Sequence, residues 1–128
     1  MTLDSSALIA ILFGESGHLD LIDRILVADR VRVGTPTVVE ASMVLAGRRR
    51  TEAVGEVEAL LQELGVTIVP FGEPEWHAAV EAFLRFGRRR HAAALNFGDC
   101  LAYGAAAAAN DSLLFVGDGF KLTDVTPA

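Results

Sequence analysis

Short segments of β-strand composition alternate with longer helical patterns along the whole chain, and this alternation restricts the fold more than any other feature. Strands separated by helices are typical of β-α-β units, in which the strands pair in parallel and helices cover both faces of the sheet. We therefore expect an α/β protein with three α/β/α layers and a central, mostly parallel sheet of four to five strands. The predicted strands are Thr2–Leu3, 30–33, 66–70 and 113–117, with 124–126 as a fifth.

Helix-end signals bound three of the helical segments. Thr35 offers an N-cap hydroxyl before Pro36, and Gly47 can supply a left-handed last residue, so we predict a helix over 36–46. A second helix opens at 72–74, and a third begins at Asn96 or Gly98 and reaches Asn110. The second carries Trp76, Val80, Phe83 and Leu84 on one stripe, while the alanines of the third favour close packing against a sheet or another helix.

Length and composition indicate one soluble domain over residues 1–128. Apolar residues make up 52% of the chain, but no run approaches the roughly 18 continuous apolar positions of a membrane helix. The N-terminal residues show no export signal, so we expect a cytoplasmic protein without membrane association. A single cysteine excludes an internal disulfide. The net charge of −6 argues against a surface coated for non-specific nucleic-acid binding, but it permits a basic rim around an acidic pocket.

Four acidic residues fall at positions where parallel α/β folds place ligands. Asp4 and Asp118 directly follow predicted strands, whose carboxyl ends share one edge of the sheet. Glu40 is the only charge in an apolar helix, where an unpaired buried carboxylate costs several kcal/mol. Asp99 belongs to the first turn of the alanine-rich helix. Three of these acids also have a structural interpretation: Asp4 as a helix cap, Glu40 as an exposed or arginine-paired acid, and Asp99 as a first-turn residue favoured by the helix dipole.

Carboxylates that meet from separate segments repel one another unless a cation intervenes, and all-oxygen ligands select Mg²⁺ or Mn²⁺. The three histidines and Cys100 do not have the spacing of zinc ligands. A carboxylate-held Mg²⁺ binds phosphate oxygens and can activate a water for attack on phosphorus, so the predicted reaction is phosphodiester hydrolysis.

A polyanionic substrate needs cations near such a pocket. The candidate phosphate contacts are the arginines of two basic segments, although arginines at helix C-termini are also ordinary solvated residues. They are Arg48, Arg88, Arg89 and Arg90.

Four segments, in order, resemble the acidic motifs of the PIN-domain ribonucleases, in particular the VapC toxins of bacterial toxin–antitoxin pairs. They are LDSSAL, TPTVVEASMVL, LNFGDCLAYGAA and LLFVGDGFKLTDV. The resemblance implies a PIN-like fold and a metal-dependent endoribonuclease. It implies catalytic roles for Asp4, Glu40, Asp99 and Asp118, with Asp4, Asp99 and Asp118 as Mg²⁺ or Mn²⁺ ligands and Ser6 as a hydroxyl that supports the first acid.

One departure from the family pattern affects the fourth acid. Many relatives read Gly-Asn-Asp-Phe where this chain has Gly117-Asp118-Gly119-Phe120, so the acid next to the phenylalanine is a glycine. Asp124 is the alternative fourth acid, and its structural interpretation is a turn or strand-edge residue.

The resemblance also implies two protein partners besides the RNA substrate. One is a cognate VapB-like antitoxin, which inhibits the toxin by laying a C-terminal segment over its groove, and the other is a second copy of the chain in a homodimer.

Two competing functions remain. A catalytically weak or inactive PIN-like binding protein would keep most of the acids, and Gly119 is compatible with it. A receiver-type phosphoacceptor domain has similar length and alternation, but it needs a pair of acids after the first strand and an aspartate that closes the third. Here Ser5 and Ser6 follow Asp4, and the third strand ends without an acid.

Overall fold

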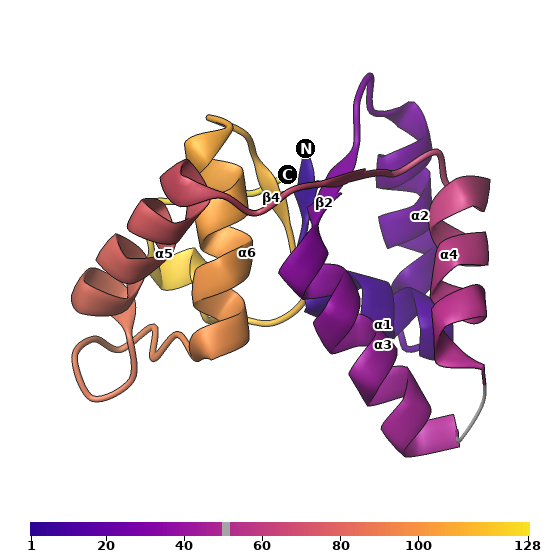
Figure 1. Cartoon of the computed structure of the whole chain (residues 1–128), viewed down its shortest axis with the longest axis horizontal. Coiled ribbons are helices and arrows are strands. Elements are labelled where there is room, and N and C mark those ends of the chain that lie inside the picture. The colour runs from indigo at the N-terminus through magenta and orange to yellow at the C-terminus, as the bar shows by residue number, and fades with distance from the viewer. Residues whose placement is uncertain (50–51) are drawn as a thin grey trace.

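The computed structural model describes residues 1–49 and 52–128 and confirms the predicted three-layer α/β/α architecture (Figure 1). Its sheet has the strand order β3-β2-β1-β4, and all three neighbouring pairs are parallel. The four strands are β1 (Thr2–Leu3), β2 (Arg32–Gly34), β3 (Thr67–Val69) and β4 (Leu113–Leu114). Because all strands are parallel, their carboxyl ends lie along one edge of the sheet.

The fifth predicted strand, at 124–126, does not form. Pro127 instead makes an isolated parallel bridge with Leu113. The physical reason is that this segment is held by side chains: the Thr123 hydroxyl donates to the carbonyl of Phe120, and Tyr103 donates to Asp124. The segment is therefore fixed against the helical layer without a continuous ladder.

Helices fill the intervals between the strands, as predicted, and each of the three intervals contains two of the described helices. The described helices are α1 (Ser5–Phe13), α2 (His18–Val27), α3 (Thr35–Arg49), α4 (Ala53–Glu63), α5 (Glu73–Phe86), α6 (Phe97–Ala108) and the short 3₁₀ helix η1 (Phe120–Leu122). In the described part of the chain, no single helix is long and apolar enough to cross a membrane. The pair α1 and α2 reaches that length and composition together, but it is bent by 119°.

The prediction that Gly47 ends its helix is wrong, because α3 continues to Arg49. Gly47 does not have a left-handed φ. The next turn is stabilised by Arg48, whose guanidinium lies 4.7 Å from the ring centroid of Phe13 and 3.4 Å from Glu15. Left-handed residues do follow two other helices: Gly14 ends α1 with a φ of 61°, and Asn110 follows α6 with a φ of 50°.

Two hydrophobic cores lie on opposite faces of the sheet. Figure 1 shows α1 to α4 on one face and α5 with α6 on the other. The first core is built around Leu3, Leu8, Val33 and Leu45, and the second around Ala82, Phe86, Ala102 and Leu113.

Helix α6 packs very closely against its neighbours. A Cβ added at Gly104 would lie 2.5 Å from the Glu75 carbonyl oxygen and 2.9 Å from the Ala79 Cβ, both on α5. On the sheet side, a Cβ added at Gly34 would lie 3.3 Å from the Ala105 Cβ. The small residues of α6 thus have the packing role that the sequence indicated.

Helix α5 turns its small residues to the core and its large apolar stripe to the surface. Ala79, Ala82 and Phe86 are buried. Trp76, Val80, Phe83 and Leu84, the stripe predicted from the sequence, are all exposed. The protein therefore presents an uncovered apolar face on this side.

Candidate active site at the carboxyl edge of the sheet

Asp4 follows β1 and begins α1, so one residue joins the sheet edge to a helix N-terminus. Its Oδ2 accepts hydrogen bonds from the Ser6 N–H, at 3.0 Å, and from the Ser6 hydroxyl. Its own N–H donates to the Leu114 carbonyl at 2.9 Å, which ties it to β4. The helix-cap interpretation is correct for Oδ2, and Ser6 makes the supporting contact that the family resemblance implied.

The other oxygen of Asp4 has no such partner. The residue is only 2% exposed, and Oδ1 is buried without a hydrogen-bond donor among the described residues. Burial raises the pKa of Asp4 to about 6 despite the hydrogen bonds from Ser6, and the negative charge of Asp99 adds to the rise. A buried oxygen with unused acceptor capacity is a site for a cation or a proton.

Asp99 lies in the first turn of α6, close enough to Asp4 to affect its ionisation. Its N–H donates to Asn96 Oδ1 at 2.9 Å, and the Asn96 N–H donates to Asp99 Oδ2 at 2.8 Å. This reciprocal pair is a capping box, so the helix-start interpretation of Asp99 is correct as well. These two bonds fix the position of the Asp99 carboxylate, and they use only its Oδ2 atom, not Oδ1.

Glu40 reaches from α3 to the N-terminus of α6. A Cβ added at Gly98 would lie 2.5 Å from both carboxylate oxygens of Glu40. Glu40 is half-buried and forms no ion pair within residues 1–49 and 52–128, so the arginine-paired interpretation does not hold there. The absence of a side chain at position 98 is what allows the carboxylate to lie against the turn that carries Asp99.

Replacing Gly98 by Ala should therefore reduce activity without unfolding the protein. The added methyl group would displace the Glu40 carboxylate, whose flexible end can move at little cost, while alanine improves helix propensity by about 0.5–1 kcal/mol. We expect an unchanged or slightly higher unfolding midpoint in urea and a lower rate of the phosphodiester hydrolysis that the sequence predicts. A large loss of stability, or full activity, would contradict this account of Gly98.

Asp118 follows β4, but its carboxylate points to solvent. Its side chain is 88% exposed, and Lys121 Nζ lies 2.7 Å from Oδ1. The hydrogen bond from Lys121 holds the pKa of Asp118 below its ordinary value. Two residues earlier, the Val116 N–H donates to the Ser6 hydroxyl at 3.0 Å, so this loop does pass beside the residue that supports Asp4.

Asp124, the alternative fourth acid, is engaged elsewhere. It accepts a hydrogen bond from the Tyr103 hydroxyl at 2.6 Å and pairs with Arg85 Nη2 at 2.6 Å. It lines a cavity together with Asp111, and Asp111 bonds Thr2 and Arg32 at the amino ends of their strands. Asp124 thus lies toward the edge of the sheet opposite to Asp4, which argues against its membership of the acidic cluster.

The described residues contain no group of three or more His, Cys, Asp or Glu side chains arranged to hold a metal ion. The predicted ligand set Asp4, Asp99 and Asp118 is therefore not gathered, because Asp118 is paired with Lys121 and one oxygen of Asp99 belongs to the helix cap. What the structure does bring together is Asp4 with Asp99 on one side and Glu40 with Gly98 on the other.

The four candidate phosphate-binding arginines have different surroundings. Arg48 contacts Phe13 and Glu15, at the far end of α3 from the acids. Arg88, Arg89 and Arg90 are exposed in the loop between α5 and α6, and the Arg90 guanidinium lies 5.1 Å from the Phe83 ring centroid. Only this loop leads directly to the capping box at Asn96.

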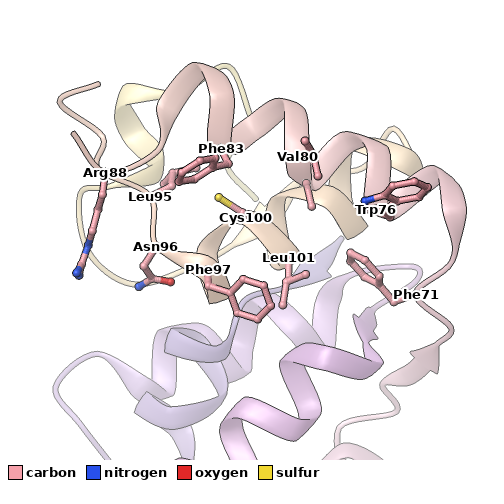
Figure 2. A pocket seen from close by; sticks show the side chains of 11 residues that line it. Phe71, Trp76, Val80, Phe83, Arg88, Leu95, Asn96, Phe97, Cys100 and Leu101 are labelled. Atoms are coloured by element: carbon pink, nitrogen blue, oxygen red, sulfur yellow. The ribbon is translucent and has the colours of Figure 1, made fainter. Parts of the chain in front are cut away.

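Two adjoining apolar grooves border the acids, and sequence reasoning did not identify them. One, of about 710 Å³, includes Glu40, Met43, Phe97 and Gly98 in its lining. The other, of about 480 Å³, runs between α5 and α6, with Arg88, Asn96 and Phe97 at one end and Trp76 at the other (Figure 2). The apolar stripe of α5 is visible in the sequence, but it would predict a groove only if it were known that the stripe faces solvent and not the core.

Comparison with protein families gives a match over nearly the whole chain. The model of the PIN domain family matches residues 1–125. Ribonuclease VapC36 of Mycobacterium tuberculosis is 39% identical over 126 residues, which cover 98% of this chain and 91% of that protein. Ribonuclease VapC of Mycolicibacterium smegmatis is 36% identical, over 98% of this chain and 97% of that protein.

Solved structures share the fold at lower sequence identity. Mycobacterium tuberculosis VapC20, described as a toxin that cleaves the sarcin-ricin loop, superposes with a TM-score of 0.77 at 14% identity, covering 99% of this chain and 97% of that one. A chain of VapBC2 from Rickettsia felis, bound to a DNA fragment from its promoter, gives a TM-score of 0.75 at 12% identity, covering 99% of this chain and 96% of that one.

Proposed function

We propose that this chain, which belongs to the PIN-domain family and within it to the VapC ribonucleases, is a cytoplasmic endoribonuclease toxin that hydrolyses RNA phosphodiester bonds at Asp4, Glu40 and Asp99. One observation carries the proposal. Asp4 is buried with an unpartnered Oδ1, and burial together with the neighbouring carboxylate of Asp99 raises its pKa to about 6. A buried, unpaired carboxylate lowers the stability of the fold, and residues that do so are typically found at functional sites.

The residues present fit a divalent cation, with Mg²⁺ or Mn²⁺ as the proposed cofactor. The unpartnered Asp4 Oδ1 and the Asp99 carboxylate are hard oxygen donors whose repulsion a cation would relieve. A group of only two neighbouring acids suits Mg²⁺, which keeps several waters and takes one or two carboxylates together with substrate phosphate. When bound, the ion would offset charge on the phosphate and activate a water for attack.

The chain's own residues would orient these groups. Ser6 holds Asp4 through Oδ2 and leaves Oδ1 directed away from that bond, while the capping box fixes Asp99. Glu40 lies over Gly98 as the third acid. Asp118 lies in the loop that bonds Ser6, and it would join the site only by leaving Lys121.

Phosphate contacts are proposed for the α5–α6 loop. Arg88, Arg89 and Arg90 are exposed in the loop that leads to the capping box at Asn96, and Arg88 lines the same groove as Asn96. This placement gives the basic rim that a protein of net charge −6 needs in order to attract RNA. Arg48 has its own partners and is the weaker candidate.

A VapB-like antitoxin and a second copy of the chain are proposed as protein partners. The groove lined by Glu40, the groove between α5 and α6, and the exposed stripe of α5 are surfaces that partners could cover. The structure of a VapBC pair among those that share this fold supports an antitoxin partner.

The test is RNA cleavage by the purified chain, freed of any antitoxin. We expect cleavage in Mg²⁺ or Mn²⁺ and its loss in EDTA, because the paired carboxylates need a cation between them and the phosphate. The matched variant is Asp99→Asn, which should lose cleavage but keep the fold, because its amide oxygen can still accept the hydrogen bond from the Asn96 N–H. Cleavage that continues in EDTA would contradict the metal requirement. RNA binding without cleavage under all conditions would favour the inactive binding protein instead.

A further inference from the structure

Phe97 is an exposed aromatic residue beside the acid pocket, by which we mean the site of Asp4, Glu40 and Asp99 at the sheet edge; it lines one groove together with Glu40. It is the first residue of α6, between the N-cap Asn96 and Gly98, and it is 81% exposed. The next large side chain along α6 on the core side, Tyr103, is only 8% exposed. Leaving a phenylalanine ring in solvent forgoes roughly 1.5–3 kcal/mol of burial, so a stability argument does not explain its position.

The surroundings of Phe97 combine apolar, cationic and acidic groups. Its ring belongs to both apolar grooves, one of which also contains Glu40 and Gly98. Figure 2 shows the ring beside Leu101, with Asn96 next to it and Arg88 beyond Asn96. Arg88 is exposed and makes no ion pair within the described part of the chain. Phe97 therefore belongs to the turn that carries Asp99, and the exposed Arg88 lines one of the same grooves.

We propose that Phe97 is a stacking platform for one unpaired nucleobase of the RNA, adjacent to the phosphate that enters the acid pocket. This inference rests on the proposed ribonuclease function. A base stacked on Phe97 is joined through its sugar to a phosphate at the level of Gly98 and Asp99, and Arg88 contacts the backbone on the other side. Phe97 would therefore position the substrate, and the site would accept only nucleotides that are single-stranded or extruded from a helix.

Charge favours a nucleobase over an apolar peptide as the occupant. Exposed aromatic rings next to arginines along a groove are typical of single-stranded nucleic-acid sites, because every base offers a π-face and the backbone needs cations. An apolar peptide segment would use the ring, but it would have no use for the unpaired Arg88 or for the carboxylates of Glu40 and Asp99.

The experiment measures RNA binding and cleavage with Phe97 variants. The probe is a set of short single-stranded oligoribonucleotides that carry 2-aminopurine at successive positions, because stacking on an aromatic ring quenches its fluorescence. Phe97→Leu keeps apolar bulk without an aromatic face, and Phe97→Trp keeps the face. Val27→Ala is the control, because Val27 is an exposed apolar residue of α2 that lines neither groove.

We expect the wild-type protein and Phe97→Trp to quench one position of the probe, and Phe97→Leu to lose the quenching. RNA affinity of Phe97→Leu should fall about 5- to 150-fold, the range for one base–aromatic stack, and cleavage should show this mainly as a higher KM. Val27→Ala should behave as wild type.

The outcomes separate this inference from the proposed function. Cleavage by the wild type with unchanged quenching and KM in Phe97→Leu would overturn the stacking role and leave the ribonuclease intact. An inactive wild type would overturn the ribonuclease, while position-specific quenching that needs the ring would still support base stacking. A changed oligomeric state in Phe97→Leu with unchanged RNA binding would assign the ring to a protein interface and overturn the inference.

Discussion

Replacing Asp4 by Asn should abolish RNA cleavage and, at the same time, make the metal-free protein more stable at pH 7. Activity should fall about 100-fold or more, the scale for losing one electrostatic group of an active site. Stability should rise because the asparagine amide keeps the cap to Ser6 but carries no charge to bury. Most substitutions of buried polar residues destabilise a protein, so the two changes together identify a functional residue.

The stability gain of Asp4→Asn should depend on pH in a defined direction. The pKa of Asp4 is about 6 in the folded protein against 3.8 for an unperturbed aspartate, so the folded state favours the protonated acid. The contribution of this group to stability is complete below about pH 4 and is lost as pH rises through 6, by about 3 kcal/mol in total. Unfolding in urea with EDTA should show no advantage for Asp4→Asn below pH 4 and the full advantage above pH 6.

Asp111 provides the control with the opposite sign. Burial disfavours its carboxylate, but bonds from the N-terminal ammonium and Thr2 and the charge of Arg32 outweigh burial, so its pKa is lowered. Asp111→Asn should therefore lower stability at pH 7, with a penalty that fades on acidification. Equal pH profiles for the two variants, or a loss of stability in Asp4→Asn at pH 7, would contradict the environment described for Asp4.

Replacing Gly104 by Ala should cause a large loss of stability. The added Cβ would lie 2.5 Å from the Glu75 carbonyl oxygen and 3.0 Å from the Ala79 nitrogen, and these backbone atoms cannot yield as a side chain does. Helices α5 and α6 must separate, so we expect a loss of about 1–3 kcal/mol in urea unfolding despite the better helix propensity of alanine.

Gly47→Ala is the matched control for Gly104→Ala, because Gly47 is also helical but a Cβ there would meet nothing within 4 Å. It should raise stability by about 0.5–1 kcal/mol. If the two variants changed stability in the same direction, close packing would not be the reason for glycine at position 104.

The sequence predicted the parts of the fold that depend on local pattern and on strand direction. The order of elements and the parallel sheet follow from alternation, and the position of Asp4 at the sheet edge follows from the direction of β1. Local signals were ambiguous where tertiary contacts decide. Helix α3 continues past Gly47 because Arg48 contacts Phe13 and Glu15. Residues 124–126 do not form a strand because the Tyr103 hydroxyl donates a hydrogen bond to Asp124.

The candidate site was predictable as a set of acids but not as an arrangement. The approach of Glu40 to Gly98 depends on how α3 and α6 cross, which no local pattern encodes. The pairing of Asp118 with Lys121 was visible as an i, i+3 spacing, although that spacing alone does not show that the pair forms. The exposure of Phe97 could not be predicted, because an exposed phenylalanine and a buried one look the same in the sequence.

The acids of the site come from elements that pack into different hydrophobic cores, on opposite faces of the sheet. Asp4 and Glu40 belong to helices that pack on one face of the sheet, and Asp99 belongs to the helix on the other face. The strands between them are only two or three residues long, so few backbone bonds hold the two halves in register. The cation proposed for these acids would also hold the two halves together, so its binding should stabilise the whole domain as well as the site.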